Sequence, residues 1–213
     1  MKIKNLLVLL MLLCVVGVTD AQDRFPKREF RGAWIQCVNG QFQGMSAQQM
    51  QQMLTRQLDY LQEAGINAVI FQVRAEADAL YHSSFEPWSR FLTGVQGKAP
   101  SPRWDPLQFM IDACHERGME LHAWINPYRA KTKGTTALSP NHPYNKFPER
   151  FIEYDGQLYF DPGLPENRKY ICMIVRDIVS RYDIDAIHMD DYFYPYPNPV
   201  SYTHLRAHET GAY

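Results

Sequence analysis

The sequence predicts an α/β protein built around a parallel β-sheet. Four short apolar runs resemble strands, and each of the first three is followed, after a loop, by apolar residues at helical 3.6-residue spacing. The runs are apolar nearly throughout, which is typical of strands covered on both faces. Strand–helix alternation favours right-handed crossover connections between parallel strands. A barrel and an open doubly wound sheet both match, but no G-x-G-x-x-G follows the first strand, which weakens the dinucleotide-binding version.

The elements follow in order along the chain. Strands are expected at residues 32–38, 67–73, 121–125 and 186–189. The first helix begins after Ser46, a suitable N-cap, and stops at Gly65. The second opens at Asp105 and ends at Gly118, and the third starts near Pro165. These signals predict three complete helices between four strands.

Two strand-to-helix loops, residues 74–104 and 127–164, are longer than a structureless connection should be. Within the second, residues 151–160 alternate around Asp155-Gly156, which predicts a small hairpin. In α/β barrels the loops after the strands carry the active site. Long, aromatic-rich loops on that side therefore indicate a ligand cleft.

Composition excludes several classes of protein. The chain has 213 residues, 46% of them hydrophobic, and 22 basic residues against 23 acidic ones. This balance is unlike a disordered chain or a polybasic nucleic-acid binder, so no nucleic-acid partner is expected. Lys2 and Lys4 precede an apolar run that is too short for a bilayer, which needs about 20 residues. The start therefore predicts a signal peptide over residues 1–21, cleaved near Ala21, a secreted or periplasmic location, and no membrane span in the mature chain.

Cleavage would leave three cysteines, Cys37, Cys114 and Cys172, and an odd number argues against a disulfide framework. We expect all three to be small core residues. At the other end, residues 200–213 form a predicted non-native tail, because residues 200–210 lack any period and resemble a translated sequencing adapter. His204 and His208 in this tail have metal-ligand spacing but are assigned no function.

The strongest candidate site lies at the end of the fourth strand. Side chains alternate along a strand, so His188 and Asp190 point one way while Met189 and Asp191 point the other. Asp190 is the better candidate for an inward carboxylate, and Asp191 for a group that orients a neighbour. A glycosidase pair flanks the scissile bond at about 5–5.5 or 6.5–9.5 Å, so the second carboxylate should come from another strand.

Two other interpretations of this constellation stay open. One is that the acidic side chains cap loop amides at the strand end. The other is a metal site using His188, Asp190 and Asp191, with His122 as a further ligand type. No H-x-H or H-E-x-x-H motif accompanies these residues, so the sequence predicts neither a metal nor another cofactor.

The third strand adds polar groups at its end. His122, Trp124 and Asn126 share a face, and Tyr128 and Arg129 follow them. An amide, a phenol and a guanidinium beside an aromatic ring suit a polyhydroxylated ligand. The alternative is that Trp124 belongs to a barrel core and Arg129 to a surface ion pair.

The second strand contributes Gln72 and Arg74 on one face. We expect Arg74 to pair with Asp78 or Asp190, because a nearby cation keeps a nucleophilic carboxylate ionised. The alternative is an ion pair that only braces the loop.

These motifs occur in one known order, so the chain resembles the glycosyl-hydrolase-like family 10 proteins of bacteria from about Glu29 to Pro195. The motifs are Arg31-Gly32-Ala33-Trp34, Val73-Arg74, Asp78-Ala79-Leu80-Tyr81, Glu86-Pro87-Trp88-Ser89, Leu92-Thr93-Gly94, Trp104-Asp105-Pro106-Leu107, His122-Ala123-Trp124-Ile125-Asn126-Pro127-Tyr128-Arg129, Asp161-Pro162-Gly163 and the run from His188 to Pro195.

The resemblance implies a (β/α)8 barrel, export and hydrolysis of glycosidic bonds, for some members in peptidoglycan glycan stripped of its peptides. The fold class is then the N-terminal half of a (β/α)8 barrel, residues 22–199, truncated after the fourth strand. The family's barrel also resembles α-amylase-type enzymes, whose nucleophile ends the fourth strand. His188-x-Asp190 stands where that pattern has Arg-x-Asp, so Asp190 maps to the nucleophile or transition-state stabiliser.

The candidate catalytic residues are thus Asp190 and Asp191. The candidate polysaccharide-binding residues are Arg74, Tyr81, Trp88, Asn126, Tyr128, Arg129 and His188, of which Tyr81 and Trp88 would stack on a sugar. The partner acid of such barrels lies on the fifth strand or later, so we expect the 213-residue chain itself to be inactive. The alternatives are a metal-dependent hydrolase on the same barrel and a non-catalytic carbohydrate-binding protein.

Overall fold

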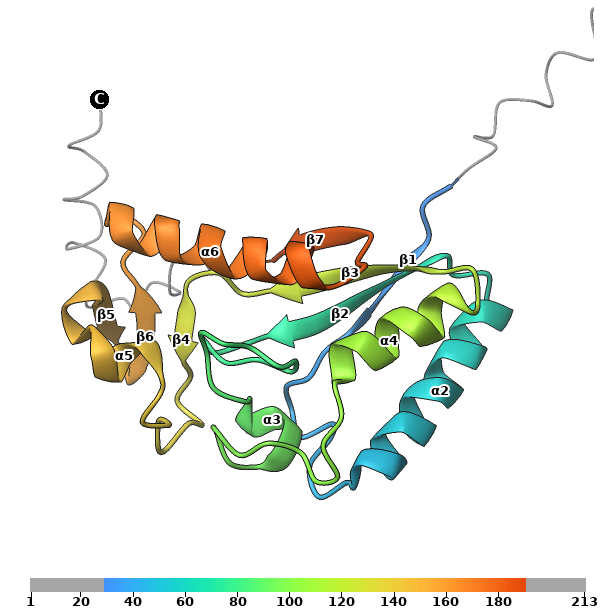
Figure 1. The fold of residues 1–213 in the computed structure, drawn as a ribbon, viewed down its shortest axis with the longest axis horizontal. Coiled ribbons are helices and arrows are strands. Elements are labelled where there is room, and N and C mark those ends of the chain that lie inside the picture. Colours follow the sequence, from blue (N-terminus) through green and yellow to red (C-terminus); the bar gives the residue numbers. More distant parts are fainter. Residues whose placement is uncertain (1–28, 191–213) are drawn as a thin grey trace, which may run out of the picture. The chain divides into compact units, whose positions relative to one another are not determined.

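A computed structural model describes residues 29–190 (Figure 1). Its main sheet has four parallel strands in the order β1-β2-β3-β7, with β1 at Gly32–Ile35, β2 at Ala68–Arg74, β3 at Glu120–Ile125 and β7 at Ala186–Met189. The parallel α/β fold predicted from the sequence is therefore confirmed. The predicted signal peptide, Asp191 and the tail from residue 200 lie outside the described residues.

Three long helices connect these strands, as the 3.6-residue spacing predicts: α2 at Ala47–Glu63, α4 at Pro106–His115 and α6 at Pro165–Arg181. The loops contain α3 at Arg90–Thr93, α5 at Pro143–Lys146 and the 3-10 turn η2 at Pro148–Arg150. A small antiparallel sheet has the order β4-β6-β5, with β4 at Arg129–Lys131, β5 at Phe151–Tyr154 and β6 at Gln157–Phe160. Strands β5 and β6 are the expected hairpin. Strand β4 is not predicted, because three residues are too few to show a period.

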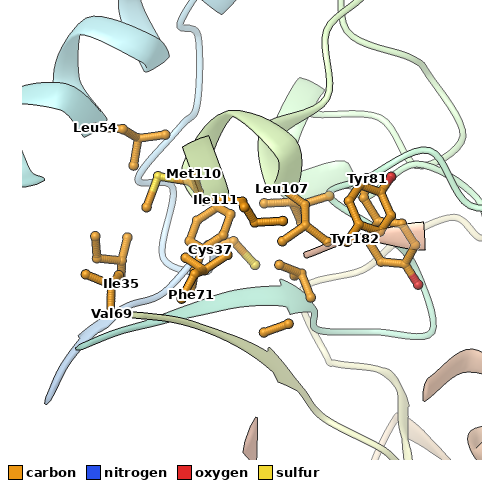
Figure 2. Close-up of a cluster of buried hydrophobic side chains, with 14 of the residues drawn as sticks. Ile35, Cys37, Leu54, Val69, Phe71, Tyr81, Leu107, Met110, Ile111 and Tyr182 are labelled. Carbon is orange, nitrogen blue, oxygen red and sulfur yellow. The ribbon is translucent and has the colours of Figure 1, made fainter. Parts of the chain in front are cut away.

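The helices pack on one face of the main sheet. Alternate residues of β2 (Val69, Phe71, Val73) and of β3 (Leu121, Ala123, Ile125) belong to one buried cluster. The same cluster takes Leu54 from α2, Met110 from α4 and Ile174 from α6, and Figure 2 shows part of it. We call this cluster the helix-side core.

The order of the strands and the side on which the helices lie decide between a barrel and an open doubly wound sheet, the two folds that the sequence leaves open. In a doubly wound sheet the strand order reverses and helices cover both faces. Here the order follows the chain without reversal, and the three long helices share the helix-side core. Right-handed crossovers that always step in one direction give this result, and it is the winding of a barrel.

Strand β1 ends earlier than predicted. The apolar run continues to Val38, but the backbone N–H of Cys37 donates to the side-chain Oε1 of Gln72 at 3.1 Å instead of to a neighbouring strand. The Gln72 side chain here takes the place of a backbone hydrogen bond between strands, so β1 stops at Ile35. Beside it, the register of β2 with β3 shifts between Gln72 and Arg74. Both irregularities lie at the carboxyl ends of the strands.

The cysteine prediction is confirmed for Cys37 and Cys114, which are buried, and is wrong for Cys172, which is exposed. The buried positions of α6 include Asn167, Ile171, Ile174 and Ile178. Position 172 lies off this stripe, on the solvent side of the helix. No helix within residues 29–190 combines the length and the apolar character needed to cross a membrane.

The start of α2 confirms the predicted N-cap. The Ser46 hydroxyl accepts from the backbone N–H of Gln49 at 3.3 Å, and the Gln49 side chain accepts from the backbone N–H of Ser46 at 2.8 Å. This reciprocal arrangement is a capping box, which satisfies two backbone donors at the helix end.

Ser46→Ala is expected to lower the free energy of unfolding by about 1 kcal/mol, because the substitution leaves the Gln49 donor without its acceptor. Chemical denaturation of the purified protein measures the loss. Ser180→Ala on the exposed side of α6 is the matched control, with an expected change within about 0.5 kcal/mol. Equal effects of the two substitutions would contradict the role given to the cap.

Candidate functional site

The face of the sheet opposite the helix-side core carries the polar residues. Because side chains alternate along a strand, Gln72 of β2, Trp124 of β3, Asn126 just after β3 and Asp190 just after β7 share this face. Arg74, predicted on the same face as Gln72, follows the register shift of β2, so alternation does not place it there. The structure thus brings together residues from three strand ends, as the sequence predicts. In a barrel this face is the interior, and the carboxyl ends of the strands form the active-site side.

Side-chain amides connect the strand ends. Gln72 Nε2 donates to Asn126 Oδ1 at 2.7 Å, and Asn126 Nδ2 donates to the backbone carbonyl of Asp190 at 3.3 Å. Gln72 Oε1 accepts from Cys37, and the backbone N–H of Asn126 donates to the carbonyl of Arg74 at 2.9 Å. Gln72 and Asn126 are both buried. These bonds hold the ends of all four strands together.

His188 lies between two tryptophans on the same face. Its ring centroid is 5.9 Å from that of Trp34 and 6.3 Å from that of Trp124, with edge contacts to both. Within the described part of the chain, the buried Nε2 of His188 and the buried Nε1 of Trp124 have no hydrogen-bond partner. Trp34 is 61% exposed because it belongs to the outer strand β1.

Arg74 pairs with Glu86, so the expected ion pair with Asp78 or Asp190 is wrong. Arg74 Nε and Nη2 donate to the two carboxylate oxygens of Glu86 at 2.7 and 2.6 Å. Its Nη1 donates to the carbonyls of Asn126 and Pro127. The loop after β2 returns Glu86 to the strand end, and both charged side chains are fully excluded from solvent. The ion pair of Arg74 therefore braces the loop after β2, which is the alternative that the sequence left open.

The Arg74–Glu86 pair also anchors α6. The hydroxyl of Tyr170 donates to Glu86 at 3.2 Å, and the Arg74 guanidinium lies 5.8 Å from the ring centroid of Phe160. The Phe160 and Tyr170 rings stack at 5.5 Å. One buried ion pair therefore fixes the loop after β2, the end of β3 and the small sheet relative to one another.

The two aromatic side chains predicted to stack on a sugar lie elsewhere. Tyr81 is fully buried in the helix-side core, where its ring meets the edge of Tyr182 at 5.7 Å (Figure 2). Trp88 is partly buried against the same core, and its ring contacts His82 at 6.4 Å. In this structure both rings stabilise the loop after β2, and neither lies on the face that carries Asp190.

A cleft of about 500 Å³ lies over the loops that follow β1, β2 and β3. Arg129, at the start of β4, is one of its walls, and Tyr128 packs beside it against the small sheet. The residues lining the cleft are Val38, Asn39, Gly40, Gln43, Arg90, Phe91, Gly94, Arg129 and Thr132. A larger hollow of about 630 Å³ runs along the outer strand β1 and α2. The first is the candidate site, because it lies on the side where barrels bind substrate.

The sequence gives no signal for a buried acidic cluster behind this cleft. Glu76, fully buried, accepts from Arg90 Nε at 3.1 Å and from the hydroxyls of Thr132 and Thr135. Two residues on, Asp78 accepts from Gln96 Nε2 at 3.2 Å. These contacts join the loops after β2 and β3 beneath the wall formed by Arg90 and Thr132.

Ala77 separates the two acids and has a φ of 51°, in the left-handed region. That turn sends the two carboxylates to different neighbours, so Asp78 points away from Arg74 and cannot form the predicted ion pair. His142 is buried next to them, with Nε2 near the carbonyls of Glu76 and Ala130. Burial lowers the pKa of His142.

Burial and the neighbouring Glu76 carboxylate raise the pKa of Asp78 to about 6. The ordinary pKa of an aspartate carboxyl is 3.8, so the folded state disfavours the ionised form. The stability linked to Asp78 is therefore fully present below pH 3.8 and is lost as the pH rises through about 6.

The free energy of unfolding of the unsubstituted protein should fall with rising pH, whereas that of Asp78→Asn should not, because the amide has no proton to lose. The difference between the two proteins should therefore shift in favour of Asp78→Asn by about 3 kcal/mol between pH 4 and pH 8. Denaturation curves at several pH values measure this difference. Asp155→Asn on the exposed hairpin is the control, with an expected change within about 0.5 kcal/mol. A difference for Asp78→Asn that stays constant with pH would contradict the assignment.

Within residues 29–190 no three His, Cys, Asp or Glu side chains form a group that could hold a metal ion. His122 Nε2 lies 3.0 Å from Glu120. Asp191, the remaining candidate ligand, lies outside the described residues.

Comparisons with known proteins point to one family. The family model described as Glycosyl hydrolase-like 10 matches residues 29–207. The glycosyl hydrolase YngK of Bacillus subtilis (strain 168) is 45% identical over 188 residues, which are 85% of this chain and 36% of that protein. The glycosyl hydrolase DigH of Escherichia coli (strain K12) is 42% identical over 158 residues, 70% of this chain and 36% of its own. The chain thus spans about a third of the length of these relatives.

A solved structure supports the fold. A maltogenic α-amylase, AmyB, from Thermotoga neapolitana superposes with a TM-score of 0.51 at 14% identity, over 85% of this chain and 43% of that chain. At this identity the similarity concerns the fold alone.

Proposed function

Because this chain belongs to the Glycosyl hydrolase-like 10 family, we propose that it is the N-terminal half of a secreted glycoside hydrolase barrel, truncated after the fourth strand. Support comes from the sequential strand order, from the long helices on one face, and from the share of the relatives that the chain covers. The longer protein that this proposal implies is called the intact protein.

The observation that carries the proposal is the position of Asp190. It follows β7 on the polar face, and its backbone carbonyl is bonded to Asn126 beside the carboxyl ends of the other strands. A carboxylate at this end of a barrel strand is where glycosidases place one of their two acids. We assign Asp190 as nucleophile or transition-state stabiliser and Asp191 as a group that orients a neighbour.

The chemistry then needs a second carboxyl group to protonate the leaving oxygen. The proposal places it on a later strand of the intact protein. The polysaccharide would lie in the cleft lined by Arg129 and Thr132, where guanidinium and hydroxyl groups match sugar hydroxyls. Peptidoglycan glycan strands are the proposed substrate.

Hydrolysis of purified glycan strands by the intact protein tests the function. New reducing ends are expected from the intact protein and none from the 213-residue chain, because the proposal places the acid on a later strand. Sugar release by the 213-residue chain would refute the proposal that the second catalytic carboxyl group lies on a later strand of the intact protein. Binding of glycan without turnover by the intact protein would favour a carbohydrate-binding role instead.

Export is part of the same proposal. The mature protein is expected to begin at Gln22 after cleavage near Ala21. N-terminal sequencing of the protein recovered from an exporting host checks this, and an intact Met1 in the exported protein would contradict it.

A further inference from the structure

Two amide side chains in series cross the sheet at the candidate site. Beginning at β1, the backbone N–H of Cys37 donates to Gln72 Oε1 at 3.1 Å, and the Cys37 thiol lies 3.4 Å from the same oxygen. Gln72 Nε2 then donates to Asn126 Oδ1 at 2.7 Å, and Asn126 Nδ2 donates to the Asp190 carbonyl at 3.3 Å. We call this series the amide relay.

The direction of the hydrogen bond is fixed at both ends of the amide relay. A backbone N–H can only donate, and a backbone carbonyl can only accept. The Gln72 oxygen must therefore face Cys37, and the Asn126 nitrogen must face Asp190. Burial raises the pKa of the Cys37 thiol, so this group also stays a protonated donor. Only two groups that each accept on one side and donate on the other satisfy this order.

The two amide side chains of the relay are almost fully buried. Gln72 is 1% exposed and Asn126 is 2% exposed, so water cannot replace a lost partner easily. The relay also lies beside the buried Arg74, whose Nη1 donates to the Asn126 carbonyl. The relay thus orients the Asn126 side chain, and Arg74 holds the Asn126 backbone.

We propose that Gln72 is a positioning residue, which acts through Asn126 to fix the backbone that carries the Asp190 carboxylate. This inference rests on the proposed glycosidase function. It also gives Asn126, predicted from the sequence as a sugar ligand, the role of a link between Gln72 and Asp190.

Gln72→Glu in the intact protein tests the proposal, because it changes polarity with little change in shape. The ionised carboxylate still accepts from Cys37 but cannot donate to Asn126. The Asn126 amide would then turn its nitrogen towards residue 72 and its oxygen towards the Asp190 carbonyl, and the bond to Asp190 would be lost. At low pH the protonated carboxyl group donates again and restores the original order.

The expected result is a fall in kcat for glycan hydrolysis of about 10²-fold at pH values above the pKa of the new carboxyl group, with KM changed by less than about 2-fold. The ratio of variant to unsubstituted kcat should rise towards one as the pH falls through the pKa of the new carboxyl group. Gln52→Glu on the exposed surface of α2 adds the same charge and should leave both constants unchanged. Unchanged kcat in Gln72→Glu, or a loss that low pH does not reverse, would overturn the proposal.

A readout without activity separates this proposal from the function it rests on. In the Gln72→Glu protein, the carbonyl ¹³C shift of Asp190 should change while the amide of Cys37 keeps its protection from hydrogen exchange. Gln72→Met should disturb both. An Asp190 shift that is the same in all forms would refute the relay even if the enzyme is active. An inactive intact protein with the expected shifts would refute the glycosidase function and leave the relay supported.

Discussion

Asp190→Asn in the intact protein is expected to lower kcat for glycan hydrolysis by about 10⁴-fold, because an amide cannot attack or stabilise the anomeric centre as a carboxylate does. The amide keeps the size of the side chain. The backbone carbonyl that accepts from Asn126 is also retained, so the fold should be preserved. The measurement is the rate of reducing-end formation at saturating substrate, together with the Kd for a non-hydrolysed oligosaccharide.

The control for this substitution is Asp155→Asn, which changes an exposed carboxylate in the hairpin of β5 and β6. It should leave kcat within about 2-fold, as a surface change away from the cleft does. Retained turnover in Asp190→Asn would remove Asp190 from the mechanism. Loss of binding along with turnover would assign it to substrate binding instead.

The second large effect concerns stability. Arg74→Met is expected to lower the free energy of unfolding by about 3–5 kcal/mol, because it leaves the Glu86 carboxylate buried without its cation. Both side chains are fully excluded from solvent, so water cannot replace the missing partner. The carbonyls of Asn126 and Pro127 lose a donor in the same step. Urea denaturation of the intact protein measures the loss.

Two further variants separate the buried pair from an ordinary surface pair. Lys133→Met breaks the exposed pair with Asp155 and should cost less than about 1 kcal/mol. Adding Glu86→Leu to Arg74→Met should recover part of the loss, because no unpaired charge then stays buried. If Arg74→Met lowered the free energy of unfolding as little as Lys133→Met does, the stabilising role given to the buried Arg74–Glu86 pair would be contradicted.

Local signals in the sequence were sufficient for the regular elements. Ser46 and Asp105 cap the helices that they were predicted to open, and both capping side chains accept from backbone N–H groups of the first turn. The strands were recognisable as short apolar runs, although among the four strands of the main sheet β2 alone is buried along its whole length. Alternation along the strands also placed Asn126 and Asp190 on one face, and the structure brings them together.

Long-range partners were not predictable in the same way. Arg74 finds Glu86 through the path of an irregular loop, and no sequence period encodes that path. The left-handed turn at Ala77 sends Asp78 away from Arg74. Tyr81 looks like a surface aromatic in a loop, yet the loop folds back beneath α4 and buries it. Glu76 and Thr132 meet only because two long loops pack together.

A crystal structure of the intact Asp190→Asn protein with a glycan oligosaccharide tests whether residue 190 acts at the scissile glycosidic bond. We expect a sugar over the carboxyl ends of β1, β2, β3 and β7, with residue 190 beside an anomeric carbon and a carboxyl group from a later strand on the other side of that bond. An oligosaccharide bound elsewhere, or one whose glycosidic bonds lie out of reach of residue 190, would contradict it.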